Sequence, residues 1–155
     1  MTDERIGDRL LPTIRRLPPG SGIVFRHLAT PRAERLALFR SIRRIAVARR
    51  LTLVAIGGLA GSRSHGGKRP FTAPAHDARE AATMRRAGAE ILFVSPIFTT
   101  RTHPGARPLG IRRAAAIGRA RKGVRIALGG MTQAKWRTIR PHGFYGWAAI
   151  DGLTR

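Results

Sequence analysis

Residues 77–110 read DAREAATMRRAGAEILFVSPIFTTRTHPGARPLG, and this stretch decides the class of fold. Asp77, followed three residues later by Glu80, is a capping-box pattern that predicts the start of a helix. Gly88 suits the left-handed residue that ends such a helix. The apolar run Ile91–Ile97 follows at once and predicts a buried strand. A helix that leads directly into a buried strand is typical of an α/β protein.

The same alternation continues on both sides of this stretch. Apolar spacing predicts further helices over 3–17, 30–50, 111–121 and 132–140, and further strands over 23–28, 51–56, 71–73, 124–128 and 143–150. The Gly-, Ser- and Arg-rich segment 57–70 predicts a flexible loop. Near-continuous apolar strands that alternate with amphipathic helices indicate one domain over 1–155. Its six parallel strands would be buried on both faces.

Length and composition exclude several classes of protein. The chain has 155 residues, 43% of them hydrophobic, which is enough for one core. It contains no Cys, which excludes disulfide frameworks, zinc ribbons and iron–sulfur clusters. The longest apolar runs are strand-sized, whereas a membrane span needs about 20 residues. No apolar segment follows the first five residues as in a signal peptide, so we expect a cytoplasmic protein with no membrane partner.

The charge balance is strongly basic, with a formal net charge of +22. Arg supplies almost all of the positive charge, since the only lysines are Lys68, Lys122 and Lys135. One interpretation is a nucleic-acid partner, because basic surfaces release counterions from polyanions. The other is an enzyme with Arg-covered helix exteriors, whose stems pack while the charged heads stay wet. The arginines are spread along the chain without a nucleic-acid-binding motif, so nucleic acid is kept only as an alternative partner.

Polar residues gather where the predicted strands end, which is where parallel α/β proteins place their active sites. The loop after the strand Ile91–Ile97 carries hydroxyls, two arginines and a histidine, and such donors suit a phosphorylated ligand. Gly129-Gly130 ends another strand just before the helix capped by Thr132. Two glycines there would let backbone N–H groups approach an anion at the start of the helix. We therefore predict a phosphate site formed by this loop and these glycines.

Taken in order, these segments resemble the thiamine-phosphate synthase and TenI superfamily. The resemblance rests on five segments, which are Thr72–His76 with Glu80, Ala87–Ile91, Ser95–Thr102, Ala127–Met131 and Gly143–Ile150. It implies a (β/α)₈ barrel and a role in thiamine biosynthesis. The synthase joins an aminopyrimidine diphosphate to a thiazole phosphate and releases pyrophosphate, whereas the TenI branch aromatises the thiazole phosphate by proton transfer. Because the chain is short for this barrel, we expect an incomplete TIM-type barrel of about six strands with helices outside.

The resemblance also assigns substrate-binding residues. They are Arg26, which matches the arginine of the family's pyrimidine site, and Thr100, Thr102, Gly129 and Gly130. A full synthase needs Mg²⁺ held by an Asn-Asp pair and a further Asp. Here Ile56-Gly57-Gly58 stands at the matching strand end, so we expect no metal site and ligand binding that is independent of Mg²⁺. Asp151 falls beside the expected thiazole phosphate, where its charge would oppose a phosphate.

Two histidines are candidates for proton transfer. His103 follows the Thr-x-Thr segment in place of the family's Lys, and His76 precedes the Asp77 cap. An imidazole has an ordinary pKa near 6.5, which suits a group that takes a proton and returns it. His27, His65 and His142 are interpreted as structural or inert. Two other functions stay open, namely a non-catalytic phosphate-ligand binder and an Arg-rich nucleic-acid-binding protein, and a homo-oligomer would cover the open barrel edge.

Overall fold

The strands form two parallel sheets in this computed structural model, which describes residues 1–101, 105–119 and 123–150. The first sheet contains β1 (Gly22–Phe25), β2 (Thr52–Ala55) and β3 (Arg63–Ser64). The second contains β4 (Thr72–Ala75), β5 (Ile91–Val94), β6 (Val124–Ala127) and β7 (Gly146–Trp147). A single parallel bridge between His65 and Thr72 connects β3 to β4. The strands therefore follow one another in chain order around both sheets.

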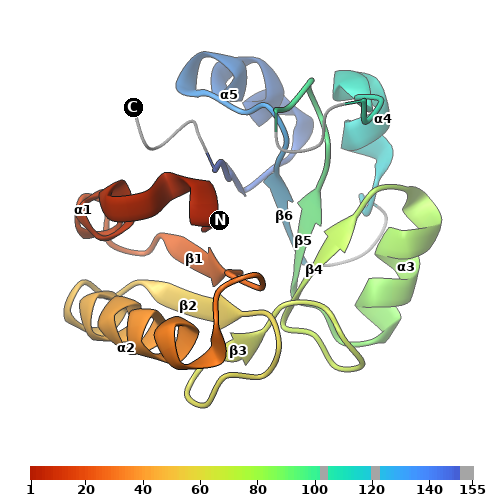
Figure 1. Cartoon of the computed structure of the whole chain (residues 1–155). Coiled ribbons are helices and arrows are strands. Elements are labelled where there is room, and N and C mark those ends of the chain that lie inside the picture. Colours follow the sequence, from red (N-terminus) through yellow and green to blue (C-terminus); the bar gives the residue numbers. More distant parts are fainter. Residues whose placement is uncertain (102–104, 120–122, 151–155) are drawn as a thin grey trace.

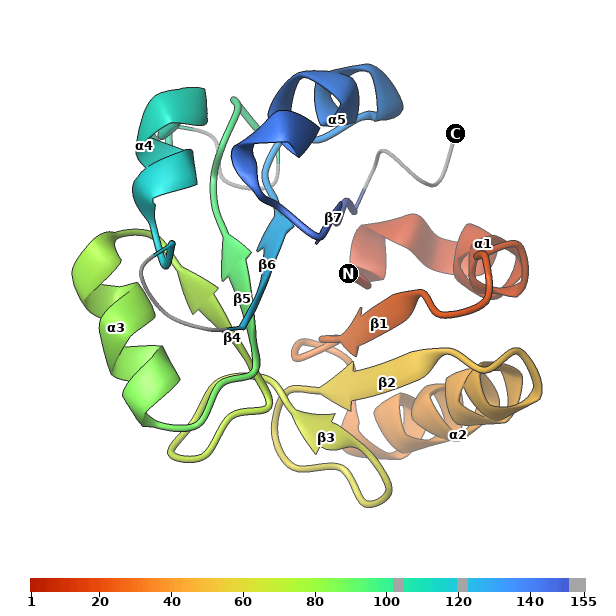
Figure 2. The same ribbon diagram turned by 180° about the vertical axis from the view of Figure 1, so that it is seen from behind.

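The helices lie outside the strands, as Figures 1 and 2 show from opposite sides. The α-helices are α1 (Leu10–Arg15), α2 (Arg32–Ala48), α3 (Ala78–Arg86), α4 (Gly110–Ala116) and α5 (Gln133–Ile139). Two 3₁₀ helices, η1 (Glu4–Arg9) and η2 (Arg140–His142), adjoin α1 and α5. Parallel strands with an outer helical layer confirm the predicted incomplete barrel. No helix of the described residues is long and apolar enough to cross a membrane.

Several local details differ from the sequence-based prediction. The described residues contain a seventh strand, because the two-residue strand β3 lies within the segment 57–70 that was predicted to be a loop throughout. The predicted helix over 3–17 is instead η1 followed by α1, because Gly7 adopts a φ of 56° that no helix accommodates. The helix predicted over 30–50 begins two residues later, at Arg32, with Pro31 as its N-cap residue.

Alternate residues of the strands feed separate apolar clusters. On β1, Ile23 and Phe25 pack outward against the helices η1, α1 and α2, whereas Val24 points to an inner cluster. That inner cluster also contains Val54 of β2 and Phe93 of β5, which come from different sheets. A third cluster packs β4–β6 against α3, α4 and α5. The two sheets thus have separate outer cores and share the barrel interior.

The N-terminal residues span the space between the two outermost strands, β7 and β1. The Met1 amino nitrogen donates to the carbonyl of Ala149 at 2.9 Å, two residues after β7. The Thr2 N–H donates to the carbonyl of Val24 on β1, also at 2.9 Å. β1 and β7 do not pair with each other in the part of the chain that is described. The first two residues therefore lie where a further strand would close the barrel.

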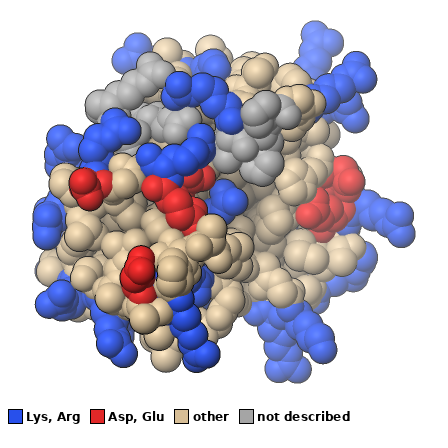
Figure 3. Space-filling model, viewed as in Figure 1, with Lys and Arg blue, Asp and Glu red and all other residues tan. Residues whose placement is uncertain are grey.

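Several arginines are structural, and they bind main-chain carbonyls instead of carboxylates. Arg125 on β6 is only 7% exposed. Its guanidinium donates to the carbonyls of Ala115, Ile117, His142 and Gly143 at 2.7–3.2 Å. Other Lys and Arg side chains are scattered over the face shown in Figure 3. Part of the basic composition therefore has a structural use that requires no polyanion.

Candidate active site at the carboxyl ends of the strands

A cavity of about 180 Å³ lies at the carboxyl ends of β1, β4, β5 and β6. Four of the predicted site residues line it, namely Arg26, His76, Thr100 and Gly129. They come from four different strand ends, so the parallel sheets bring together residues up to about a hundred positions apart. Its wall also includes Ser95, Pro96 and Leu128, which the sequence analysis did not single out as site residues. Thr102, His103 and Asp151 lie outside the described residues.

Arg26 places a positive charge at this cavity. Its backbone N–H donates to the hydroxyl of Thr2 at 3.0 Å, which fixes the residue directly after β1. Among the described residues, its guanidinium has no hydrogen-bond or ion-pair partner. Burial, and secondarily this guanidinium, lowers the pKa of the Met1 amino group to about 6. The electrostatic environment of the cavity therefore favours an anionic group.

His76 is held by a carboxylate on the first turn of α3. Glu80 Oε2 accepts from the His76 backbone N–H and lies 2.8 Å from both that nitrogen and the ring Nδ1. The Glu80 N–H in turn donates to the Asp77 carboxylate at 2.7 Å, so the predicted cap is confirmed. Because an ionised carboxylate only accepts, the neutral imidazole carries its proton on Nδ1 and leaves Nε2 unprotonated. With Nε2 unprotonated, His76 has a nitrogen that can accept a proton, as a general base does.

Gly129 and Gly130 are required by packing against the neighbouring loop. They adopt φ values of 93° and 62°. A Cβ at Gly129 would lie 2.6 Å from Pro96 Cα, and a Cβ at Gly130 would overlap the carbonyl oxygen of Thr99. The Phe98 N–H donates to the Gly129 carbonyl at 3.1 Å across the same contact. Packing is thus a second reason for glycine at both positions, beside the anion approach predicted from the sequence.

The backbone N–H groups of this turn are nevertheless available. Among the described residues, those of Gly129 and Gly130 have no hydrogen-bond acceptor. The Thr132 hydroxyl accepts from the Lys135 N–H at 3.3 Å, which confirms Thr132 as the cap of α5. Because α5 has only seven residues, its dipole adds little to anion binding. The turn itself supplies the donors.

The same elements match a known family. The family model described as thiamine monophosphate synthase (TMP-TENI) matches residues 62–153, which is more than half of the chain. The chain belongs to this family. The match covers the second sheet, the loop after β5 and the Gly129-Gly130 turn, and these carry most of the cavity.

Two individual proteins show the extent of the similarity. A curated protein of Aquifex aeolicus (strain VF5), named "Putative thiamine-phosphate synthase 2", is 34% identical over 77 residues. The matched segment covers 50% of this chain and 41% of that relative, so less than half of the relative's length is spanned. The solved structure of a thiamine phosphate pyrophosphorylase from Pyrococcus furiosus aligns with 99% of this chain and 84% of its own, with a TM-score of 0.83. At 17% identity, that structure supports the fold alone.

Lys135 lies at the glycine turn of this thiamine monophosphate synthase family member, and the sequence analysis did not select it. Its ammonium donates to the Gly130 carbonyl at 2.9 Å and lies 4.8 Å from the centroid of the Phe98 ring. The signal available in the sequence was its spacing, because a residue five positions after Gly130 and on the first turn of α5 faces back to that turn. Lys135 fixes the contact between the turn and the loop after β5.

The residues that the resemblance aligns with the family's metal position do not fit Mg²⁺. Gly57-Gly58 follows β2, and a Cβ at Gly57 would lie 3.9 Å from the guanidinium nitrogens of Arg35. A fixed guanidinium opposes a divalent cation at that place. In the described part of the chain, no group of three His, Asp or Glu side chains could hold a metal ion. No step of the chemistry below is therefore assigned to a metal.

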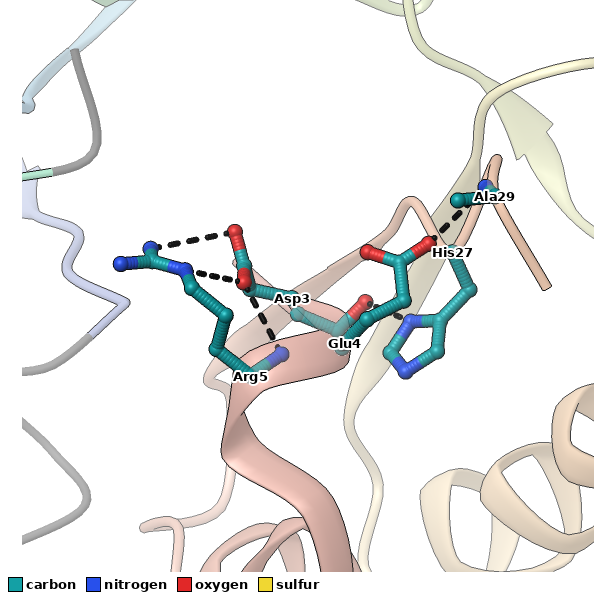
Figure 4. A network of polar contacts seen from close by, with 6 residues as sticks. Asp3, Glu4, Arg5, His27 and Ala29 are labelled. Atoms are coloured by element: carbon teal, nitrogen blue, oxygen red, sulfur yellow. Dashed lines mark hydrogen bonds and ion pairs between the residues drawn. The ribbon is translucent and has the colours of Figure 1, made fainter.

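Two other histidines have structural roles. Figure 4 shows His27 next to Glu4, on the side away from the Asp3–Arg5 ion pair, and the His27 Nδ1 lies 3.0 Å from the Thr2 hydroxyl. His27 also stacks on Phe25, and burial lowers its pKa. His65 was predicted to be inert in a flexible loop. It instead lies where β3 meets β4, with Nδ1 2.7 Å from the Thr72 hydroxyl, and burial lowers its pKa to about 4.

Proposed function

We propose that the cavity binds a phosphorylated thiazole and that the protein works in thiamine biosynthesis. The observation that carries this proposal is the meeting of Arg26, His76, Thr100 and Gly129 in one cavity. Arg26 and the free N–H groups of the glycine turn would bind the phosphate, and a hydroxyl on the loop after β5 would add a further donor. The family match supports a phosphorylated thiazole or pyrimidine as the ligand class.

The reaction that these residues support best is proton transfer on the thiazole ring, as in the TenI branch. Aromatising a thiazole tautomer removes a proton from one ring position and places a proton at another. His76 Nε2 would take the proton, because Glu80 keeps the proton of the neutral ring on Nδ1. The resulting imidazolium would be stabilised by the same carboxylate until it returns a proton. His103, the other predicted catalytic residue, stays a candidate for the second proton position.

The synthase reaction is the second candidate, and the names of the family and of the Aquifex relative favour it. It requires a diphosphate to leave and the thiazole nitrogen to attack the pyrimidine carbon. The described cavity of about 180 Å³ is small for two phosphorylated substrates together. The Gly57-Gly58 strand end also lacks the metal carboxylates of a full synthase. We therefore rank proton transfer first.

Binding is tested by titrating thiazole phosphate at physiological ionic strength into the wild type, Arg26→Gln and Arg40→Gln. Arg40 is an exposed residue of α2, so its replacement removes the same charge away from the cavity. We expect Arg26→Gln to weaken binding about tenfold or more, and Arg40→Gln to leave it unchanged. If all three proteins bound with equal affinity, and the affinity fell equally as the salt concentration rose, binding would be nonspecific attraction to the basic surface and the site would not exist.

Catalysis is tested with the same proteins and His76→Gln. Conversion of the thiazole tautomer, followed by NMR, should be lost in His76→Gln while thiazole phosphate still binds. Formation of thiamine phosphate from the two phosphorylated substrates, measured with and without Mg²⁺, tests the synthase alternative directly. If the wild type formed thiamine phosphate, the synthase reaction would be favoured over proton transfer.

A further inference from the structure

The hydroxyl of Thr2 takes the place of a main-chain carbonyl beside β1. The Thr2 N–H donates to the carbonyl of Val24 at 2.9 Å, and the Thr2 hydroxyl accepts from the Arg26 N–H at 3.0 Å. A residue on a parallel neighbouring strand bonds to two such positions, two residues apart, but it accepts through its own carbonyl. Thr2 therefore lies opposite Phe25, as one residue of a closing strand would, with its side chain as the acceptor.

Burial and a second contact hold this hydroxyl in place. Thr2 is only 2% exposed, and its hydroxyl also lies 3.0 Å from His27 Nδ1. A carbonyl can only accept, whereas a hydroxyl both accepts and donates, so Thr2 can serve an N–H and a ring nitrogen together. The His27 ring is in turn stacked on Phe25, with 5.0 Å between the ring centroids. A residue of the same shape without a hydroxyl would leave the Arg26 N–H without its acceptor.

Arg26 is held at both of its main-chain polar groups. Thr2 accepts from its N–H, and Arg35 of α2 donates to its carbonyl from Nη2 at 3.1 Å and from Nε at 3.2 Å. Arg26 is the first residue after β1 and lines the candidate site. A binding group contributes most when the residues behind it hold it in its productive position, because less freedom is then lost on binding. The backbone of Arg26 is fixed before any ligand arrives.

We propose that Thr2 is a positioning residue, whose hydroxyl raises the affinity of the cavity for a phosphoryl group through Arg26. The proposal rests on the proposed function, because it takes the Arg26 guanidinium as a phosphate-binding group. In this role Thr2 acts through Arg26 alone. The effect is also reciprocal, since a ligand that binds more tightly when the Thr2–Arg26 bond is formed must itself favour that bond.

The affinity for thiazole phosphate, measured by calorimetric titration at physiological ionic strength, tests the role of the hydroxyl. Thr2→Val keeps the shape of the side chain but removes the acceptor, so we expect binding to weaken about five- to tenfold. Thr2→Ser keeps the hydroxyl and should bind within about twofold of the wild type. Thr13→Val is the matched control, because Thr13 is also buried and its hydroxyl has no hydrogen-bond partner among the described residues. It should bind as the wild type does.

The decisive comparison is Thr2→Val in an Arg26→Gln background. If Thr2 acts through the Arg26 guanidinium, the second substitution should cause no further loss of affinity. An equal loss in both backgrounds would indicate a general structural effect, and would overturn the positioning role while leaving the proposed function standing. If Arg26→Gln bound as tightly as the wild type, the phosphate-binding role of Arg26 would fail, and this proposal with it.

Folding is checked in every variant by urea unfolding, and the mass of each protein confirms that all have the same first residue. If Thr2→Val does not fold, hydrogen exchange of the Arg26 N–H in the wild type provides the test. Thiazole phosphate should slow this exchange, because the bound ligand favours the bond to Thr2. An exchange rate that stays the same when the ligand binds would overturn the proposal.

Discussion

The two sheets form their parts of the barrel mouth by different means. In the second sheet, β4–β7, the strand ends carry glycines, hydroxyls and a histidine, and the loops there pack closely on one another. In the first sheet, β1–β3, Arg26 follows β1 and two exposed glycines follow Ile56 at the end of β2, while Arg35 reaches these strand ends from α2. The family model begins at residue 62 and so matches the second sheet. The family match therefore covers the part of the mouth that the second sheet forms, whereas in the first sheet Arg35 ties the ends of β1 and β2 together.

One glycine from each sheet shows how differently the loops at the two strand ends are packed. Gly58 and Gly130 both follow a strand and both have positive φ values, of 65° and 62°. A Cβ on Gly58 would enter open space, whereas a Cβ on Gly130 would overlap the Thr99 carbonyl oxygen. The backbone strain is therefore matched, and the only difference is the packing of the surrounding loop.

The largest effect that we predict comes from replacing Gly130 by Ala. A residue other than Gly at positive φ costs about 1 to 2 kcal/mol, which is the expected loss of unfolding free energy for Gly58→Ala. Gly130→Ala should cost about 3 to 5 kcal/mol, because the loop after β5 must also move. Urea unfolding of both variants measures the difference. Equal losses would contradict the view that the second sheet's loops are packed and the first sheet's are open.

The contact between the two sheets should respond to pH through His65. Burial lowers the pKa of this imidazole to about 4, from an ordinary value of 6.5. Between these values the unfolded chain binds a proton that the folded chain does not, so acid favours unfolding. The contribution is complete above about pH 6.5 and is lost as the pH falls toward 4. The full loss is about 3 kcal/mol at most.

Urea unfolding at several pH values tests this effect in the wild type and His65→Gln. Gln can keep the hydrogen bond to the Thr72 hydroxyl but does not titrate, so its stability should fall less between pH 6.5 and 4. His27→Gln is the comparison in the first sheet: burial also lowers the pKa of His27, so this variant should lose pH dependence in the same direction. An unchanged pH dependence in His65→Gln would mean that the junction between the sheets tolerates the protonated ring.

Local patterns in the sequence were sufficient to predict much of the second sheet. The Asp77–Glu80 cap, the Thr132 cap and the left-handed Gly88 each depend on neighbours within a few residues. The arginine contacts could not be predicted in this way. Arg35 binds the carbonyl of Ile56 21 residues away, and carbonyls are present at every residue, so nothing in the sequence marks the partner.

In the candidate site, too, some features could be predicted from local sequence patterns and others could not. Arg26, His76, Thr100 and Gly129 could be selected because they follow predicted strands, and parallel strands place their ends together. Their roles in binding and catalysis stay predictions. The short strand β3 was missed because two residues within a Gly-rich segment carry no periodic signal. The bond from Glu80 to His76 was also missed, because the capping pattern accounts for Glu80 without it.

The smallest effect concerns one helix cap in each half of the molecule. Asp77 accepts from the Glu80 N–H at 2.7 Å at the start of α3, and Asp3 accepts from the Arg5 N–H at 3.1 Å at the start of η1. Replacing either by Ala should lower the unfolding free energy by about 1 kcal/mol. The Asn variants keep an acceptor oxygen and should lose less. Urea unfolding at neutral pH measures all four.

The stability that the Asp3 cap contributes should depend on pH in the acid range. Arg5, through a hydrogen bond to the carboxylate, lowers the pKa of Asp3 below its usual value. The stability from the ionised Asp3 is thus complete above the unfolded pKa of about 3.9 and is lost as the pH falls through the folded value. Asp3→Ala and the wild type should converge in that range. The imidazole ¹⁵N chemical shifts of His76 provide the second readout. Only Asp77→Ala removes the acceptor of the Glu80 N–H, and Glu80 is the residue that contacts the His76 ring. If Asp3→Ala changed the His76 shifts as much as Asp77→Ala does, the two caps would be structurally coupled. The two sheets would then not form their parts of the mouth independently.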